Sequence, residues 1–128
     1  MIIDHFNGST DCQSDAEIAT LLAERDAADE NEFWLSPSDG FPCLVLSVSH
    51  DHACLHYFAA ENDPGCQSSG YGQGLDPDGL WHFHTTNGEA CMIDTTCVLP
   101  LAEALAAVWT FIRTSERPEA IRWEYLAE

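Results

Sequence analysis

Two stretches of the chain carry apolar residues every three to four positions, which is the spacing of an amphipathic helix. The first follows a capping box, in which the side chains of Ser14 and Glu17 can satisfy each other's exposed backbone amides. Ile18, Leu21 and Leu22 come next at i, i+3 and i+4, and they predict one buried helix face. We therefore expect a helix over about 15–27.

The second stretch lies near the end of the chain and has the clearer apolar stripe. Five residues fall at i, i+4, i+7, i+8 and i+11, namely Leu101, Leu105, Val108, Trp109 and Ile112. This stripe predicts a helix over about 100–114. Pro100 is tolerated in its first turn, and Pro118 prevents the helix from continuing.

Alternating apolar and polar residues predict strands in much of the remaining chain. Residues 2–6 and 32–35 predict short strands, the second followed by a turn at 37–40. Residues 41–58 predict a β-hairpin with its tip at His50-Asp51. Its register is given by three cross-strand pairs: Leu44–Tyr57, Leu46–Leu55 and Val48–Ala53. These pairs place the apolar residues of both arms on one face of the sheet.

The segment 59–79 holds five of the eight glycines and predicts a surface loop, with or without one short strand. Two strands are expected after it, over 80–85 and 91–99, and a closing strand over 121–125. The whole pattern predicts an α+β fold, in which an antiparallel β-sheet carries the two main helices on one face. We expect a single domain that spans residues 1–128.

The charge of the chain is strongly one-sided. There are 22 acidic side chains, four arginines and no lysine, which gives a formal net charge of -18. No basic residue lies between Arg25 and Arg113. Such a surface repels nucleic acid and anionic lipid and attracts a basic partner, although acidity also serves solubility in many small bacterial proteins. We therefore expect neither a nucleic-acid partner nor a membrane partner.

The first residues contain no basic leader before a long apolar run, and no stretch approaches the ~20 apolar residues of a membrane span. Six cysteines are present. Four of them lie in apolar, strand-like runs, where a free cysteine behaves as a small hydrophobe. These features predict reduced thiols and a cytoplasmic protein.

The chain lacks the common catalytic motifs. It has no G-x-S-x-G, no Walker loop, no H-E-x-x-H, and neither the H-x-E nor the P-C-x-x-C of a zinc deaminase. We therefore expect no enzyme, no cofactor and no metal. A small metal-binding protein stays open as an alternative, because side chains of one parity on predicted strands could meet around zinc. Its ligands would be His52, Cys54, His56, His82 and His84.

Short motifs between Phe33 and Glu124 resemble a known family. The order begins with Phe33-Trp34-Leu35 and the hairpin run Leu55-His56-Tyr57-Phe58. It ends with Ala104-Leu105, Phe111, Ser115 to Glu119 and Arg122-Trp123-Glu124. Together these motifs resemble immunity protein family one of bacterial polymorphic-toxin systems, over residues of about 30–125. Ser115 stands where this family more often has glycine.

The resemblance implies a cytoplasmic antitoxin that binds the C-terminal toxin domain of its own or a neighbouring cell. Members of this family often accompany toxins of the nucleic-acid deaminase fold. A toxin that acts on nucleic acid is expected to carry a basic groove, and an acidic inhibitor complements such a groove. The expected assembly is a heterodimer with the toxin.

The residues that could touch the toxin are chosen by charge and by their place in loops. They are Asp51, Glu61, Asp63, Tyr71, Asp76, Asp78 and Trp81. Trp81 could be an interface anchor or a core residue, whereas Trp34 and Trp109 lie in apolar patterns that predict core positions. A second alternative is a general nucleic-acid mimic, which would bind several unrelated basic proteins with similar affinity.

Overall fold

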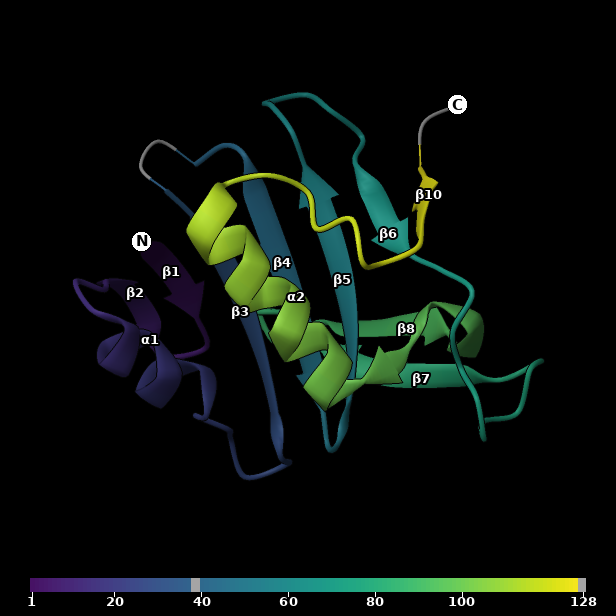
Figure 1. Cartoon of the computed structure of the whole chain (residues 1–128). Coiled ribbons are helices and arrows are strands. Elements are labelled where there is room, and N and C mark those ends of the chain that lie inside the picture. The colour runs from purple at the N-terminus through teal and green to yellow at the C-terminus, as the bar shows by residue number, and fades with distance from the viewer. Residues whose placement is uncertain (38–39, 127–128) are drawn as a thin grey trace.

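The computed structural model of the protein describes residues 1–37 and 40–126. The turn predicted over 37–40 therefore lies partly outside the described residues. Within them, eight strands form one antiparallel sheet in the order β10-β6-β5-β4-β3-β1-β2, with β9 paired to β5 (Figure 1). The strands are β1 (Ile2–His5), β2 (Gly8–Asp11), β3 (Glu30–Ser36), β4 (Cys43–Ser49), β5 (His52–Phe58), β6 (Cys66–Ser68), β9 (Leu99–Pro100) and β10 (Trp123–Tyr125).

The central hairpin has the predicted register. β4 pairs with β5 so that Leu44 faces Tyr57, Leu46 faces Leu55, and Val48 faces Ala53. His50 at the tip has a φ of 60°, in the left-handed region that is uncommon for a residue other than glycine. The α+β class and the antiparallel sheet are thus confirmed.

The first helix, α1 (Asp15–Leu22), is shorter than predicted. The capping box forms in part, because the Glu17 N–H donates to Ser14 Oγ at 3.2 Å while the Glu17 carboxylate accepts from the Gln13 N–H at 3.2 Å. After α1, the Arg25 guanidinium donates to the Leu22 carbonyl at 2.7 Å. This bond satisfies one of the free carbonyls at the helix end, so the chain turns where further helix was expected.

The second helix, α2 (Leu101–Thr114), has nearly the predicted bounds but a different buried face. The buried residues are Ala104, Ala107, Val108 and Phe111, whereas the predicted stripe residues other than Val108 are only partly buried. Small alanines allow the helix to lie close to the sheet, and the larger residues of the stripe flank that contact. Ser115 ends the helix with a φ of 55°, which explains the preference for glycine at this position.

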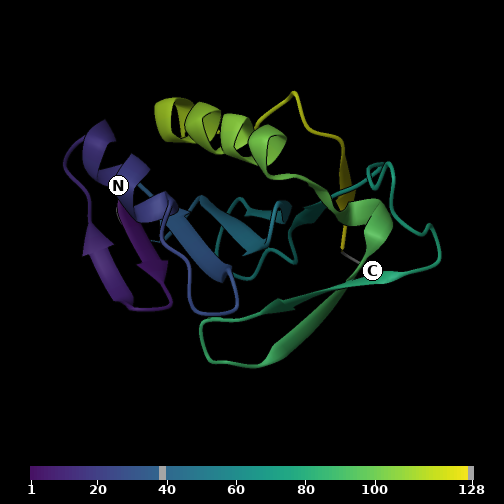
Figure 2. The same ribbon diagram turned by 90° about the horizontal axis from the view of Figure 1, so that it is seen from below.

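Both helices contribute to one core cluster with the same-face residues of the central strands, including Phe33, Leu46 and Leu55. Figure 2 shows α1 and α2 on the same side of the sheet. On the other side lies a separate antiparallel hairpin of β7 (Leu80–His84) and β8 (Ala90–Asp94). Its Phe83 is 1% exposed and packs with Cys54 and Val98 in a second, smaller cluster. We call this side of the sheet the hairpin-bearing face.

Three strand predictions need correction. The strand expected over 91–99 is interrupted, because β8 ends at Asp94 and a 3-10 turn, η1 (Thr95–Cys97), redirects the chain before β9. β2 was not predicted, since its residues Gly-Ser-Thr-Asp lack an apolar alternation. The closing strand is limited to β10. No helix among the described residues is long and apolar enough to cross a membrane.

Candidate partner-binding surface

Five of the seven predicted contact residues lie at the tip of the β4–β5 hairpin, in the loop between β6 and β7, or at the start of β7. His52 connects two of them, because its Nδ1 lies 2.9 Å from the carboxylate of Asp51 and its ring centroid lies 4.4 Å from that of Trp81. His52 and Tyr71 also line the same groove, which has a volume of about 380 Å³. We call these five residues the tip surface: Asp51, Tyr71, Asp76, Asp78 and Trp81.

The loop that carries three residues of the tip surface is held by hydrogen bonds. The Tyr71 N–H donates to the Thr96 carbonyl at 2.7 Å, and the Thr95 hydroxyl donates to the Asp76 carbonyl at 2.6 Å. The Asp76 carboxylate accepts from the Asp78 N–H at 3.0 Å. Asp76 and Asp78 are exposed, so the loop presents two carboxylates from a fixed backbone.

Glu61 and Asp63 lie elsewhere, in the loop that follows β5. The seven residues of β5 separate this loop from Asp51, a distance of about 20 Å at ~3.3 Å per residue. Asp63 also has a local structural role, since its carboxylate accepts from the N–H groups of Ala59 at 3.1 Å and Gly65 at 2.9 Å. The seven predicted residues therefore form two separate groups.

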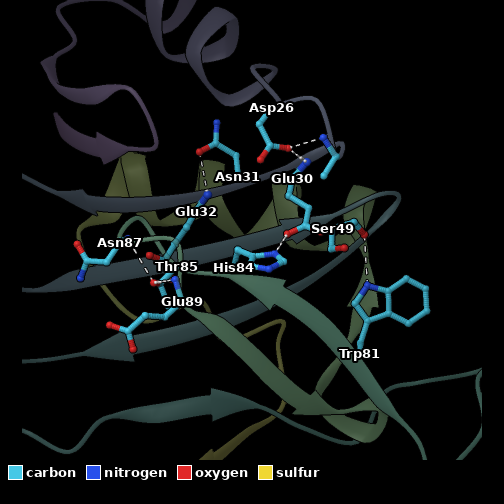
Figure 3. A network of polar contacts seen from close by, with 11 residues as sticks. Asp26, Glu30, Asn31, Glu32, Ser49, Trp81, His84, Thr85, Asn87 and Glu89 are labelled. Carbon is cyan, nitrogen blue, oxygen red and sulfur yellow. Dashed lines mark hydrogen bonds and ion pairs between the residues drawn. The ribbon is translucent and has the colours of Figure 1, made fainter.

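Buried carboxylates fasten the β7–β8 hairpin to the sheet. Glu30 Oε1 lies 2.7 Å from Nδ1 of His84 (Figure 3). Glu32 Oε1 accepts from the Thr86 N–H at 3.0 Å and from the indole N–H of Trp34 at 3.0 Å. Both glutamates are 7% exposed. Sequence reasoning missed them because a charged residue in a short strand gives no sign of its partner.

Aromatic rings form a stack on the hairpin-bearing face that was also missed. The rings of Trp34 and Phe58 lie parallel with centroids 6.1 Å apart, and those of His56 and Phe58 lie 6.4 Å apart. We call these three residues the aromatic row. The Trp34 side chain is 39% exposed, so the prediction that Trp34 is a core residue is wrong. Burial lowers the pKa of His56 to about 4, so this ring is neutral at neutral pH.

The acidic side chains are almost entirely without cationic partners. Among the described residues, four carboxylates lie within 4 Å of a nitrogen that can carry a positive charge, one of them at the N-terminus and three on histidine rings, and none on an arginine. The guanidinium of Arg113 lies 5.6 Å from the ring of Trp109, and that of Arg117 lies over the rings of Trp123 and Tyr125. The protein therefore presents a largely uncompensated negative surface.

The residues of the metal-binding alternative do not come together. Within residues 1–37 and 40–126, no three or more His, Cys, Asp or Glu side chains are placed to hold a metal ion. Cys54 is fully buried, and desolvation raises the pKa of its thiol to about 12. His56 stacks in the aromatic row, and His84 pairs with Glu30. These contacts give the side chains structural roles.

Comparison with known proteins adds a family to this geometry. Residues 8–125 match the family described as Immunity protein Imm1. The chain is also 27% identical, over 129 residues, to the double-stranded DNA deaminase immunity protein of Burkholderia cenocepacia (strain H111). That alignment covers 98% of this chain and 100% of the relative.

Proposed function

Because the chain belongs to the Imm1 family of immunity proteins, we propose that it binds one cognate toxin domain and neutralises it. The toxin class that fits best is a deaminase that acts on nucleic acid. This choice is supported by the Burkholderia cenocepacia relative, a double-stranded DNA deaminase immunity protein that aligns with nearly the whole chain. We further propose that the chain acts in the cytoplasm, stoichiometrically and without catalysis, as one half of a heterodimer.

The proposal rests chiefly on one observation: a chain of this family carries, among its described residues, many acidic side chains that are not paired with arginines. An enzyme that acts on DNA or RNA needs a basic groove for its substrate. Among residues 1–37 and 40–126 no carboxylate is paired with an arginine, so this surface can occupy such a groove without first breaking ion pairs to arginine. Long-range attraction then raises the association rate, while a few desolvated anchors set the dissociation rate.

We propose that both groups of predicted residues face the toxin. The tip surface offers Asp51, Asp76 and Asp78, and Glu61 and Asp63 lie at the end of β5 that is farther from Asp51. A protein interface of about 800 Å² per partner is roughly 30 Å across, which is wide enough to include both groups. The acids would supply steering, and Tyr71 and Trp81 would supply contact area.

The proposal predicts that a gene for a secreted protein with a C-terminal toxin domain lies beside the gene for this chain, and the test uses that domain. Its deamination of a DNA or RNA substrate should fall in proportion to added chain and stop at one chain per toxin domain. An unaffected rate at a fivefold excess of chain would refute inhibition. If unrelated basic proteins, such as lysozyme or a histone, bind as tightly as the toxin domain, the chain is a general nucleic-acid mimic instead.

The two acidic groups can be tested separately by substitutions that reverse or remove their charges. Asp76→Lys with Asp78→Lys tests the tip surface, and Glu61→Lys with Asp63→Asn tests the other loop. Each pair should slow association with the toxin domain several-fold at low salt and reduce the salt dependence of the rate. If all four changes together leave affinity and salt dependence as in the wild type, this contact assignment is wrong.

A further inference from the structure

Two residues of the aromatic row, Trp34 and His56, belong to a line of side chains that runs across the hairpin-bearing face from β1 to β10. Successive strand pairs place six side chains side by side: Asp4, Trp34, Val45, His56, Gln67 and Glu124. Glu32 lies two residues before Trp34 on the same face of β3. The Thr86 N–H donates to its carboxylate, and this bond holds the β7–β8 hairpin over the sheet next to Trp34. Trp34 therefore lies beside the hairpin and keeps 39% of its surface exposed.

Trp34 is held rigidly although it is exposed. Its indole N–H donates to Glu32 at 3.0 Å, and its ring lies within 2° of parallel to that of Phe58. A partner that covers this ring loses little side-chain entropy, because the rotamer is already fixed. Because its only polar atom is already satisfied, the indole can be covered without leaving an unpaired donor. These are the properties of an interface anchor.

The surroundings of the row define the chemistry of the partner. Asp4 is exposed and lies directly across from Trp34, and Glu124 lies at the far end of the same line. The Arg113 and Arg117 guanidinium groups contact aromatic rings of α2 and β10, on the helix-bearing side. An electron-rich indole with a carboxylate beside it attracts a guanidinium group, by stacking on the ring and by charge.

We propose that the aromatic row is the anchor site for the toxin domain, and that it takes an arginine side chain of the toxin stacked on Trp34 and paired with Asp4. This inference rests on the proposed function, since it names the part of the surface that holds the same partner. The tip surface and the other acids steer the toxin to this face. The row then determines how slowly the toxin leaves.

The test measures association and dissociation rates of immobilised toxin domain, encoded beside this chain, with wild-type chain and three variants. Trp34→Ala should raise the dissociation rate about 30-fold or more, as loss of a hot-spot residue does. Asp4→Lys, at an exposed position, should raise it about tenfold and slow association. The control is Thr110→Ala, at an exposed position of α2 on the helix-bearing side of the sheet; it should change the rates less than threefold.

Hydroxyl-radical footprinting of the unmodified chain keeps the proposal testable if Trp34→Ala fails to fold. Oxidation of Trp34 should fall at least fivefold in the complex, while that of Ile112 on α2 should be unchanged. If the wild-type chain binds the toxin domain but Trp34 stays as reactive as in the free chain, or if Asp4→Lys and Trp34→Ala bind like the wild type, the anchor is elsewhere. If the wild-type chain does not bind at all, the proposed function fails, and the anchor site with it.

Discussion

The neutral His56 ring makes the stability of the fold depend on pH in a way that can be calculated. Burial lowers the pKa of His56 to about 4 in the folded chain, whereas an unfolded histidine has a pKa of about 6.5. Between these values the unfolded chain binds one more proton than the folded chain. The neutral His56 ring therefore contributes fully to the free energy of unfolding above pH 6.5, and this contribution is lost as the pH falls toward 4. At pH 5 the loss amounts to about 2 kcal/mol.

The assay is urea denaturation of the wild type and of His56→Phe at pH 8, 6.5, 5.5 and 5. The variant keeps an aromatic ring beside Phe58 but cannot take up a proton. Between pH 8 and pH 5, the wild type should lose about 2 kcal/mol more of its free energy of unfolding than the variant. Comparing the two proteins cancels the titration of the many carboxylates. The control is His82→Gln, at an exposed position of β7. This variant should still lose the same free energy of unfolding between pH 8 and pH 5 that protonation of His56 causes in the wild type.

Parallel pH profiles for the wild type and His56→Phe, within about 0.5 kcal/mol, would contradict this reasoning. His56 would then be hydrated in solution, and the packing of the aromatic row around it would be looser than described. The rigid presentation of Trp34, which shares Phe58 as a stacking partner with His56, would lose part of its support. The experiment therefore also examines the geometry of the proposed anchor site.

Further predictions concern stability and are measured by chemical or thermal denaturation at pH 8. Glu32→Ala leaves two N–H groups without their acceptor and should lower the free energy of unfolding by about 2–4 kcal/mol; the exposed control Glu89→Ala should change it by less than about 0.5 kcal/mol, and equal effects would contradict the role of Glu32. Phe111→Ala should lower the free energy of unfolding by about 3–5 kcal/mol and Leu105→Ala by less than half of that, since Phe111 is 0% exposed and Leu105 is only partly buried. The reverse order would refute the buried face of α2 described above. Ser115→Gly should stabilise the fold by up to about 1 kcal/mol, because its φ of 55° suits glycine, and a loss of stability would show that the serine is needed there.

Much of the fold could be predicted because its elements have strong periodicity. The β4–β5 register followed from the alternation on both arms alone, with Leu46 facing Leu55. The buried face of α2 could not be read in the same way. Alanine is a weak marker of burial, so the larger Leu105 and Trp109 appeared to define the stripe, whereas Ala104 and Phe111 contact the sheet.

The candidate site was harder to predict because it depends on which strands meet. The acidity of the chain was plain, and the resemblance to an immunity family came from short motifs around residues such as Trp34 and Phe111. However, the sequence could not reveal that Glu32 would bind the indole of Trp34 and keep it on the surface. A carboxylate two residues before a tryptophan on one strand face is the only local sign of that contact.

The most direct test of the central claim is a calorimetric titration of this chain into the toxin domain encoded beside it, with lysozyme as a basic control protein. The account predicts a single transition at one chain per toxin domain, with an affinity at least about a hundredfold higher than for lysozyme, because a specific anchor adds to the general attraction of charge. Binding that is absent, or no tighter than binding to lysozyme, would contradict the conclusion that this chain is the antitoxin of one cognate toxin.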